Sequence, residues 1–125
     1  IRKKEKRAVA GLSMGGFHSL FIALNHPDKF SYVGLMSAGL NTAFLDMSMP
    51  AYKDMEGKLK NFQKEGYELF WIACGTDDFL YQNNLDFMKT CDQIGFEYTY
   101  HESERGHIWA NWRQYLLLLA PMLFR

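Results

Sequence analysis

Cysteine and proline are scarce in this chain, which has two cysteines and three prolines in 125 residues. Two cysteines are too few for a disulfide framework, and neither Cys74 nor Cys91 has a histidine or a second cysteine at ligand spacing beside it. We therefore expect no metal site and interpret each cysteine as a small buried side chain. Cysteine usage leaves the redox compartment of the protein open.

An excess of charge is also missing, because 14 basic residues balance 14 acidic ones. Without a net positive field, neither nucleic acid nor an anionic membrane is expected as a partner. No run reaches the roughly eighteen apolar residues that cross a membrane, and the leucines at 116–119 form too short a run. The basic stretch 2–7 is interpreted as a solvated lead-in to a strand rather than a localisation signal.

Apolar side chains, in contrast, are plentiful. Hydrophobic residues make up 48% of the chain and aromatic residues 16%, enough for a packed core and too much for disorder. The length is typical of one domain, 1–125. Short β-type runs alternate with helical stretches, which favours βαβ units in an α/β fold with a mostly parallel sheet. We expect buried strands at 8–12, 32–37 and 67–74, and a strand exposed on one face at 96–101.

The helical stretches lie between and after these strands. We expect helices from Gly15 to about His26, from Tyr81 to Ile94 with Gly95 closing the end, and from about Ile108 onward. One face of the last helix is predicted to dock on the sheet through Ile108, Trp112, Tyr115, Leu116 and Leu119. The segment 40–65 is mixed, with helical character from 52 to 64, and is a possible cap or insertion.

Residues 11–16 match the G-x-S-x-G nucleophile elbow, with Ser13 at its centre. A strand turns sharply into a helix there and holds the serine in a strained conformation. We expect the glycines two before and two after the serine to be required, because side chains there would collide with the neighbouring strand and helix. The backbone N–H of Met14, at the helix N-terminus, then points to where an oxyanion would form.

A phosphate-binding turn is the alternative interpretation of this glycine-rich motif. No G-K-[ST] sequence follows it, and the third glycine is adjacent to the second rather than spaced from it. The motif also follows an apolar strand and opens a helix, which is the context that a nucleophile elbow requires. The elbow is therefore the interpretation that the sequence favours.

A serine nucleophile needs a base and an acid that orients the base, and their expected order along the chain is serine, acid, histidine. Asp77 and Asp78 follow the third strand and His107 follows the fourth, so both loops lie at the same rim of the sheet as Ser13. His107 is the favoured base and His101 the second candidate. The residues alone do not separate Asp77 from Asp78.

Two further histidines compete less well for the role of base. His18 lies one turn into the elbow helix, where we expect it to pack or to support the site from behind. His26 precedes Pro27 at the end of that helix, where we expect it to be exposed and favoured by the helix dipole.

The motif at 11–16, the stretch Cys74–Leu80, and Gly106-His107 followed by Trp109 and Trp112 together resemble the esterase-D-like branch of the α/β-hydrolases. Within it, the sequence is most similar to carbohydrate esterase family 1, the feruloyl and acetyl xylan esterases. The resemblance covers essentially the whole chain. It implies that Asp78 is the acid, that Asp77 is a turn neighbour, and that no cofactor is used. It also implies a secreted or periplasmic protein.

Members of this family are roughly twice as long, an ordinary size for a domain. The resemblance therefore implies that this chain is the C-terminal half of an α/β-hydrolase fold, with about four strands flanked by helices. The missing half would supply the first four strands and the second oxyanion-hole N–H. Without those strands, the strand at 8–12 becomes an exposed edge, through which the chain is expected to self-associate or pair with the missing half.

The predicted function is hydrolysis of acyl esters by Ser13, His107 and Asp78, most simply feruloyl or acetyl esters of plant polysaccharide. Phe79, Trp109 and Trp112 lie in or beside the rim loops and are candidates for stacking on an aromatic acyl group or a sugar. Alternatively, Trp112 only anchors the last helix. S-formylglutathione hydrolases and siderophore esterases have the same triad and remain open. A catalytically incomplete fragment with a structural or interaction role is the alternative from another class.

Overall fold

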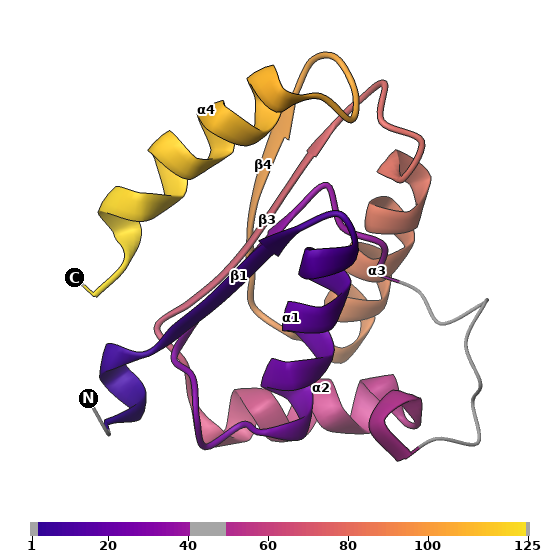
Figure 1. Ribbon diagram of the computed structural model, residues 1–125. Coiled ribbons are helices and arrows are strands. Elements are labelled where there is room, and N and C mark those ends of the chain that lie inside the picture. Colours follow the sequence, from indigo (N-terminus) through magenta and orange to yellow (C-terminus); the bar gives the residue numbers. More distant parts are fainter. Residues whose placement is uncertain (1–2, 41–49, 125) are drawn as a thin grey trace.

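The structure is a computed structural model that describes residues 3–40 and 50–124 (Figure 1). Four parallel strands form one sheet in the order β1-β2-β3-β4: β1 (Ala8–Leu12), β2 (Tyr32–Met36), β3 (Leu69–Gly75) and β4 (Thr99–Ser103). The α-helices are α1 (Met14–Asn25), α2 (Met55–Glu65), α3 (Tyr81–Ile94) and α4 (Trp109–Leu119). Short 3-10 turns lie at Lys4–Lys6, Pro50–Tyr52 and Ala120–Met122. Residues 41–49 of the possible cap segment 40–65 lie outside the described residues.

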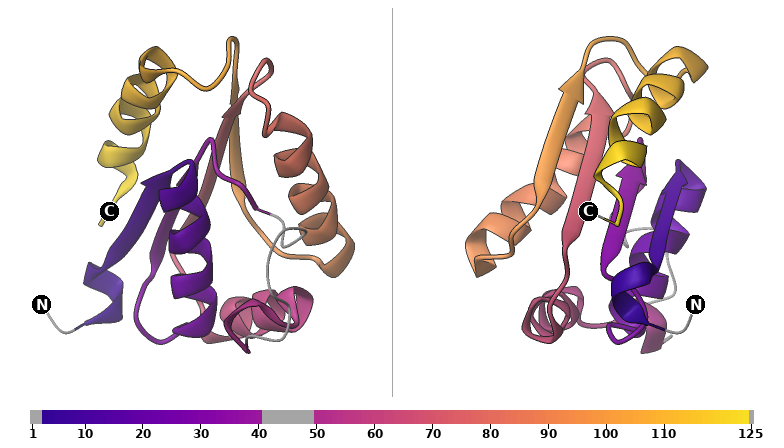
Figure 2. Two further views of the ribbon diagram at one scale, coloured as in Figure 1. Left: turned by 45° about the vertical axis from the view of Figure 1, so that its right-hand side comes forward. Right: turned by 90° about the vertical axis from the view of Figure 1, so that its left-hand side faces the viewer.

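Helices cover both faces of the sheet, so the domain has three layers (Figure 1, Figure 2). On one face α1, α2 and α3 bury the larger core, which includes Phe17, Leu20, Phe62, Phe70 and Phe87. On the other face α4 lies across β2 and β3 and buries a smaller core of Met36, Trp71, Ala73, Tyr115 and Leu119. Burial of these side chains from water is the main stabilising contribution to the fold. The apolar composition therefore forms two cores on either side of one sheet.

The edge position of β1 distinguishes it from the other predicted buried strands. β1 pairs with β2, and each of its five residues is at least partly exposed, whereas every residue of β2 is buried. Covering on both faces and both edges is what buries a parallel strand fully. The interpretation of 8–12 as a buried strand is wrong for this chain. The expectation that this strand forms an exposed edge of the sheet agrees with the structure.

The fourth strand begins later than predicted, at Thr99 rather than Phe96. The Phe96 N–H donates to the Cys91 carbonyl at 2.8 Å, which closes the end of α3, and Gly95 has a left-handed φ of 71°. These two features form the glycine-terminated helix end that the sequence predicted at Gly95. Phe96 therefore belongs to the helix end and packs into the larger core before the strand starts.

The predicted docking face of α4 is only partly right. Tyr115 and Leu119 are buried and Trp112 is half-buried, but Leu116 is 58% exposed and Ile108 is 39% exposed. The helix packs on β2 and β3 and contacts β4 through Tyr115, so its side chains pack on the sheet from one side of the helix only.

Among the described residues, no helix combines the length and the apolar character needed to cross a membrane.

Candidate active site

The loops after three strands meet at one rim of the sheet. Ser13 follows β1 directly, Asp78 follows β3, and His107 follows β4. Because all four strands are parallel, their carboxyl ends lie at the same edge, which is where ligands bind in open sheets of this kind. The topology thus brings together side chains that are 94 positions apart in sequence.

Ser13 lies at the sharp turn between β1 and α1. Its backbone has φ 54° and ψ −120°, a conformation that a non-glycine residue adopts only under strain. The Ser13 N–H donates to the Met36 carbonyl at 2.9 Å, and its carbonyl accepts from the N–H groups of Gly16 and Phe17. These bonds to β2 and to the first turn of α1 hold the strained residue in place.

Two glycines of the elbow are sterically required, but one of them is not the predicted one. A β-carbon on Gly11 would lie 2.3 Å from the Gly15 carbonyl, and one on Gly16 would lie 2.5 Å from the β-carbon of Ala38. A β-carbon on Gly15 would meet nothing within 4 Å. The predicted collision at Gly15 is therefore wrong, because the close packing of α1 on the neighbouring loop falls one residue later.

Asp78, His107 and Ser13 form a continuous hydrogen-bonded chain. The His107 Nδ1 lies 2.9 Å from Asp78 Oδ2, and the His107 Nε2 lies 3.0 Å from Ser13 Oγ. The Asp78 side chain is fully buried, whereas that of His107 keeps 21% of its surface exposed. A buried carboxylate on one ring nitrogen favours a tautomer that leaves the other nitrogen free to accept a proton.

The structure places the two neighbouring aspartates differently. Asp78 is held on both oxygens, since its Oδ1 accepts from the Leu80 N–H at 2.9 Å while Oδ2 faces His107. Asp77 is exposed, and its backbone N–H donates to the Arg105 carbonyl at 2.9 Å. Asp77 thus joins the two loops through its backbone, and Asp78 contacts the imidazole.

None of the other three histidines, all of which lie within the described residues, hydrogen-bonds to Ser13. His101 lies within β4, between the rings of Trp71 and Tyr115 on the α4 side of the sheet. His18 is exposed on α1 beside Phe17, and His26 is exposed at the end of that helix. The expectation that His18 packs inside the protein is wrong, and His26 is exposed as expected.

Aromatic rings lie on two sides of the His107 imidazole. The Phe79 and Trp112 rings each have centroids 4.9 Å from it, and Trp109 packs edge-on against Trp112 at 5.2 Å. Phe79 is 77% exposed and Trp109 72%, so both rings have surface free for a ligand. Trp112 is half-buried and contributes to the smaller core, in agreement with an anchoring role.

Comparison with known proteins assigns the chain to a family. Residues 1–121 match the model of the Esterase family, described as "Putative esterase". The chain belongs to the Esterase family. It is 27% identical to an acetyl esterase of Caldicellulosiruptor saccharolyticus over 92% of this chain and 53% of that protein. It is 53% identical to an endo-1,4-beta-xylanase/feruloyl esterase of Xylanibacter ruminicola over 98% of this chain and 15% of that protein.

Solved structures show what part of the fold this Esterase-family chain represents. An S-formylglutathione hydrolase (FrmB) from Staphylococcus aureus aligns with a TM-score of 0.77 and 28% identity, over 98% of this chain and 53% of that one. A ferulic acid esterase aligns with a TM-score of 0.75 and 25% identity, again over 98% and 53%. The chain therefore has the α/β-hydrolase fold of these esterases and spans about half of their length.

Asn84 supports the rim of the Esterase-family chain and was not predicted from the sequence. This fully buried residue of α3 donates its side-chain amide to the carbonyls of Ala38 and Leu80, each at 2.9 Å. It therefore joins the loop after β2 to the loop that carries Asp78. In the sequence, Asn84 is only a polar residue on the inward, otherwise apolar face of a predicted helix. Such residues are too common to indicate a supporting role by themselves.

The two cysteines of the Esterase-family chain are buried and carry no disulfide. Burial raises the pKa of the Cys74 thiol to about 12, and the negative charge of Asp78 adds to the effect. Burial likewise raises the pKa of Cys91 to about 12, with a further contribution from Asp92. Among residues 3–40 and 50–124, no three His, Cys, Asp or Glu side chains are grouped so that they could hold a metal ion.

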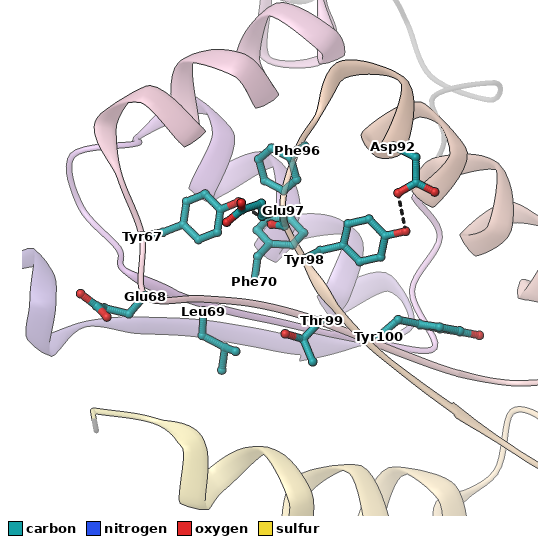
Figure 3. Close-up of a pocket in the computed structure, with 10 residues that line it drawn as sticks. All are labelled: Tyr67, Glu68, Leu69, Phe70, Asp92, Phe96, Glu97, Tyr98, Thr99 and Tyr100. Carbon is teal, nitrogen blue, oxygen red and sulfur yellow. Dashed lines mark hydrogen bonds between the residues drawn. The ribbon is translucent and has the colours of Figure 1, made fainter.

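A pocket of about 690 Å³ lies at the opposite end of the strands from Ser13, where β3 and β4 begin (Figure 3). Its tyrosines already have internal partners. Tyr98 donates its hydroxyl to Asp92 Oδ1 at 2.8 Å, and Tyr67 donates to the Glu97 carbonyl (Figure 3). These bonds stabilise the junction between α3 and β4, and the pocket is not part of the candidate active site.

Proposed function

We propose that the intact protein is a serine carboxylesterase in which Ser13 is the nucleophile, His107 the general base and Asp78 the orienting acid. The observation that carries this proposal is the chain of two hydrogen bonds, 2.9 and 3.0 Å long, from a buried carboxylate through an imidazole to a serine hydroxyl. That arrangement is defined by geometry and roles rather than by sequence position. Membership of the Esterase family supports the same reaction class.

In the first step, the Ser13 Oγ forms a bond to the acyl carbon of the ester while its proton passes to Nε2 of His107. The electron pair of the carbonyl moves onto its oxygen. When this tetrahedral intermediate collapses, the bond to the alcohol breaks and the alcohol oxygen takes the proton from Nε2. The products are a free alcohol and an acyl-serine.

In the second step, water attacks the acyl-serine and gives its proton to the same Nε2 of His107. Collapse of the second tetrahedral intermediate releases the carboxylic acid and returns the proton to Ser13 Oγ. Asp78 stays ionised throughout and stabilises the imidazolium that forms twice in each cycle. Its burial and its two hydrogen bonds fix the imidazole for both steps.

The Met14 backbone N–H is the proposed oxyanion donor. Met14 is the first residue of α1, and the first N–H groups of a helix have no acceptor within it. The helix dipole also favours negative charge at that end. A second donor is expected from residues outside this chain, whose relatives are about twice as long; loss of one such donor costs about 10²–10³ in rate.

The proposed substrates are feruloyl or acetyl esters of plant polysaccharide. This choice is supported by 53% identity to a protein named as a xylanase and feruloyl esterase, and by the exposed rings of Phe79 and Trp109 beside the imidazole. Flat aromatic rings with free faces suit an aromatic acyl group or a sugar. The 28% identity to an S-formylglutathione hydrolase supports a thioester substrate as the second candidate.

The test is a substrate panel on the full-length protein and on Ser13→Ala. Methyl ferulate, an aryl acetate and S-formylglutathione separate the three acyl classes by kcat/KM. Ser13→Ala should lower kcat on the preferred ester by a factor on the order of 10⁶, since the serine and histidine act as one unit. Turnover that survives the substitution refutes the triad. Failure of a fluorophosphonate to label Ser13 favours the alternative of a non-catalytic structural module.

A further inference from the structure

We propose that Asn111 is a positioning residue for His107, acting through the loop between β4 and α4. Asn111 lies in the first turn of α4 and is buried, at 8% exposure. Its side-chain amide donates to two carbonyls of that loop, Glu104 and Gly106, each at 2.9 Å. The second of these carbonyls belongs to the residue that directly precedes His107.

All three carbonyls between Ser103 and His107 accept hydrogen bonds, and Asn111 serves two of them. The Arg105 carbonyl accepts from the Asp77 N–H at 2.9 Å. The Gly106 carbonyl accepts from the Ile108 N–H at 3.0 Å in addition to the Asn111 amide. One buried side chain therefore fixes the Glu104–Arg105 and Gly106–His107 peptide units, because each hydrogen of its amide group has its own acceptor.

The loop needs such an anchor because its own conformation is unfavourable. Arg105 has φ 64°, in the left-handed region that a non-glycine residue rarely adopts. The loop also passes so close to the end of β3 that a β-carbon on Gly75 would lie 2.2 Å from the Arg105 carbonyl oxygen. The same β-carbon would lie 2.9 Å from Asn111 Nδ2. Asn111 and Gly75 thus hold a strained turn between them.

This anchor bears on the reaction because the His107 imidazole must stay within hydrogen-bonding distance of both the acid and the nucleophile. The imidazole contacts Asp78 at 2.9 Å and Ser13 at 3.0 Å at the same time. Asp77 ties the base loop to the acid loop through the Arg105 carbonyl, so a shift of the turn would move His107 relative to both partners. A displacement of about 1 Å can cost about 100-fold in rate. The inference rests on the proposed function.

The test compares Asn111→Leu with Gln114→Leu in the full-length protein. Both changes replace an amide by a leucine on α4, but Gln114 is exposed. The second-order rate of fluorophosphonate labelling and the kcat per labelled site should fall roughly 10- to 100-fold in Asn111→Leu, with KM within about twofold. Gln114→Leu should match the wild type. If Asn111→Leu lowers the labelled fraction but leaves kcat per labelled site unchanged, Asn111 has a purely structural role and the proposal is overturned.

A proton NMR measurement keeps this test separate from the test of the esterase reaction. The bond to Asp78 deshields the Nδ1–H proton of His107 and slows its exchange with water. A low-field resonance of this proton should therefore be present in the wild type and in Gln114→Leu, and absent in Asn111→Leu. Loss of the resonance supports positioning even if no ester is hydrolysed. If Asn111→Leu does not fold, the wild type decides: side-chain amide protons of Asn111 that exchange as fast as those of Gln114 overturn the proposal.

Discussion

A β-carbon added to Gly11 would lie 2.3 Å from both the carbonyl carbon and the carbonyl oxygen of Gly15, four residues further along the chain. Both obstructing atoms are backbone, so no rotamer change can relieve the contact. At Gly15 itself, an added β-carbon has no neighbour within 4 Å. The two glycines of the same motif therefore have different physical roles.

Gly11→Ala should be strongly destabilising, and Gly15→Ala is its matched control. Overpacking of this severity costs about 3 kcal/mol or more, because the strand must move away from α1. Gly15→Ala should be neutral or stabilising by up to about 1 kcal/mol, since alanine favours a helix over glycine. Denaturant midpoints of the two variants check this. Equal midpoints would show that the elbow can relax around a methyl group.

The two aspartates after β3 offer a second matched pair. Asp78→Asn keeps the shape of the side chain but stabilises the wrong imidazole tautomer, and a factor of about 10⁴ in kcat is expected. Asp77→Asn should change kcat by no more than a few-fold, because Asp77 contributes its backbone N–H to the loop and its side chain is exposed. Steady-state kinetics on one ester decide the assignment, and the reverse order of effects would make Asp77 the acid.

The sequence predicted features that depend on local chemistry. α3 begins at Tyr81 and ends at Ile94 as expected, because helical spacing and the glycine at 95 define both ends. The rim position of His107 followed from the order of strands and loops. In both cases a short stretch of sequence carries the signal. For His107, the parallel arrangement of the strands then places its loop at the same rim as Ser13.

Features that depend on how close two elements come were not predictable. The steric need for glycine falls on Gly16 because α1 packs on Ala38, a residue from another loop. Leu116 is exposed because α4 packs on the sheet through the side that carries Tyr115 and Leu119. Asn111 carries no sequence signal at all, since an asparagine in a helix becomes an anchor only when a strained loop lies beside it.

The exposed edge of β1 predicts how the 125-residue chain behaves when it is expressed alone. Its unpaired edge offers backbone N–H and carbonyl groups to a second copy, or to the segment that completes the fold. We expect this chain to sediment as a dimer or larger species. Ala10→Lys, at the exposed middle of the strand, should shift it toward monomer because a charge there opposes edge pairing. A monomer with cooperative unfolding would contradict this prediction.

The buried thiols of Cys74 and Cys91 predict a loss of stability at alkaline pH. Both have pKa values raised to about 12 in the folded chain, above the usual value near 9. Between these pH values the unfolded state binds fewer protons than the folded state, so stability is fully present below about pH 9 and falls as pH rises toward 12. Cys91→Ala, which removes one thiol, should flatten the fall in melting temperature between pH 9 and pH 10.5.

The same burial predicts that the thiols are unreactive in the folded protein. In native protein at pH 8, neither thiol should react with iodoacetamide, whereas both should react in urea. Rapid alkylation of the folded protein would show that burial does not hold the thiols protonated.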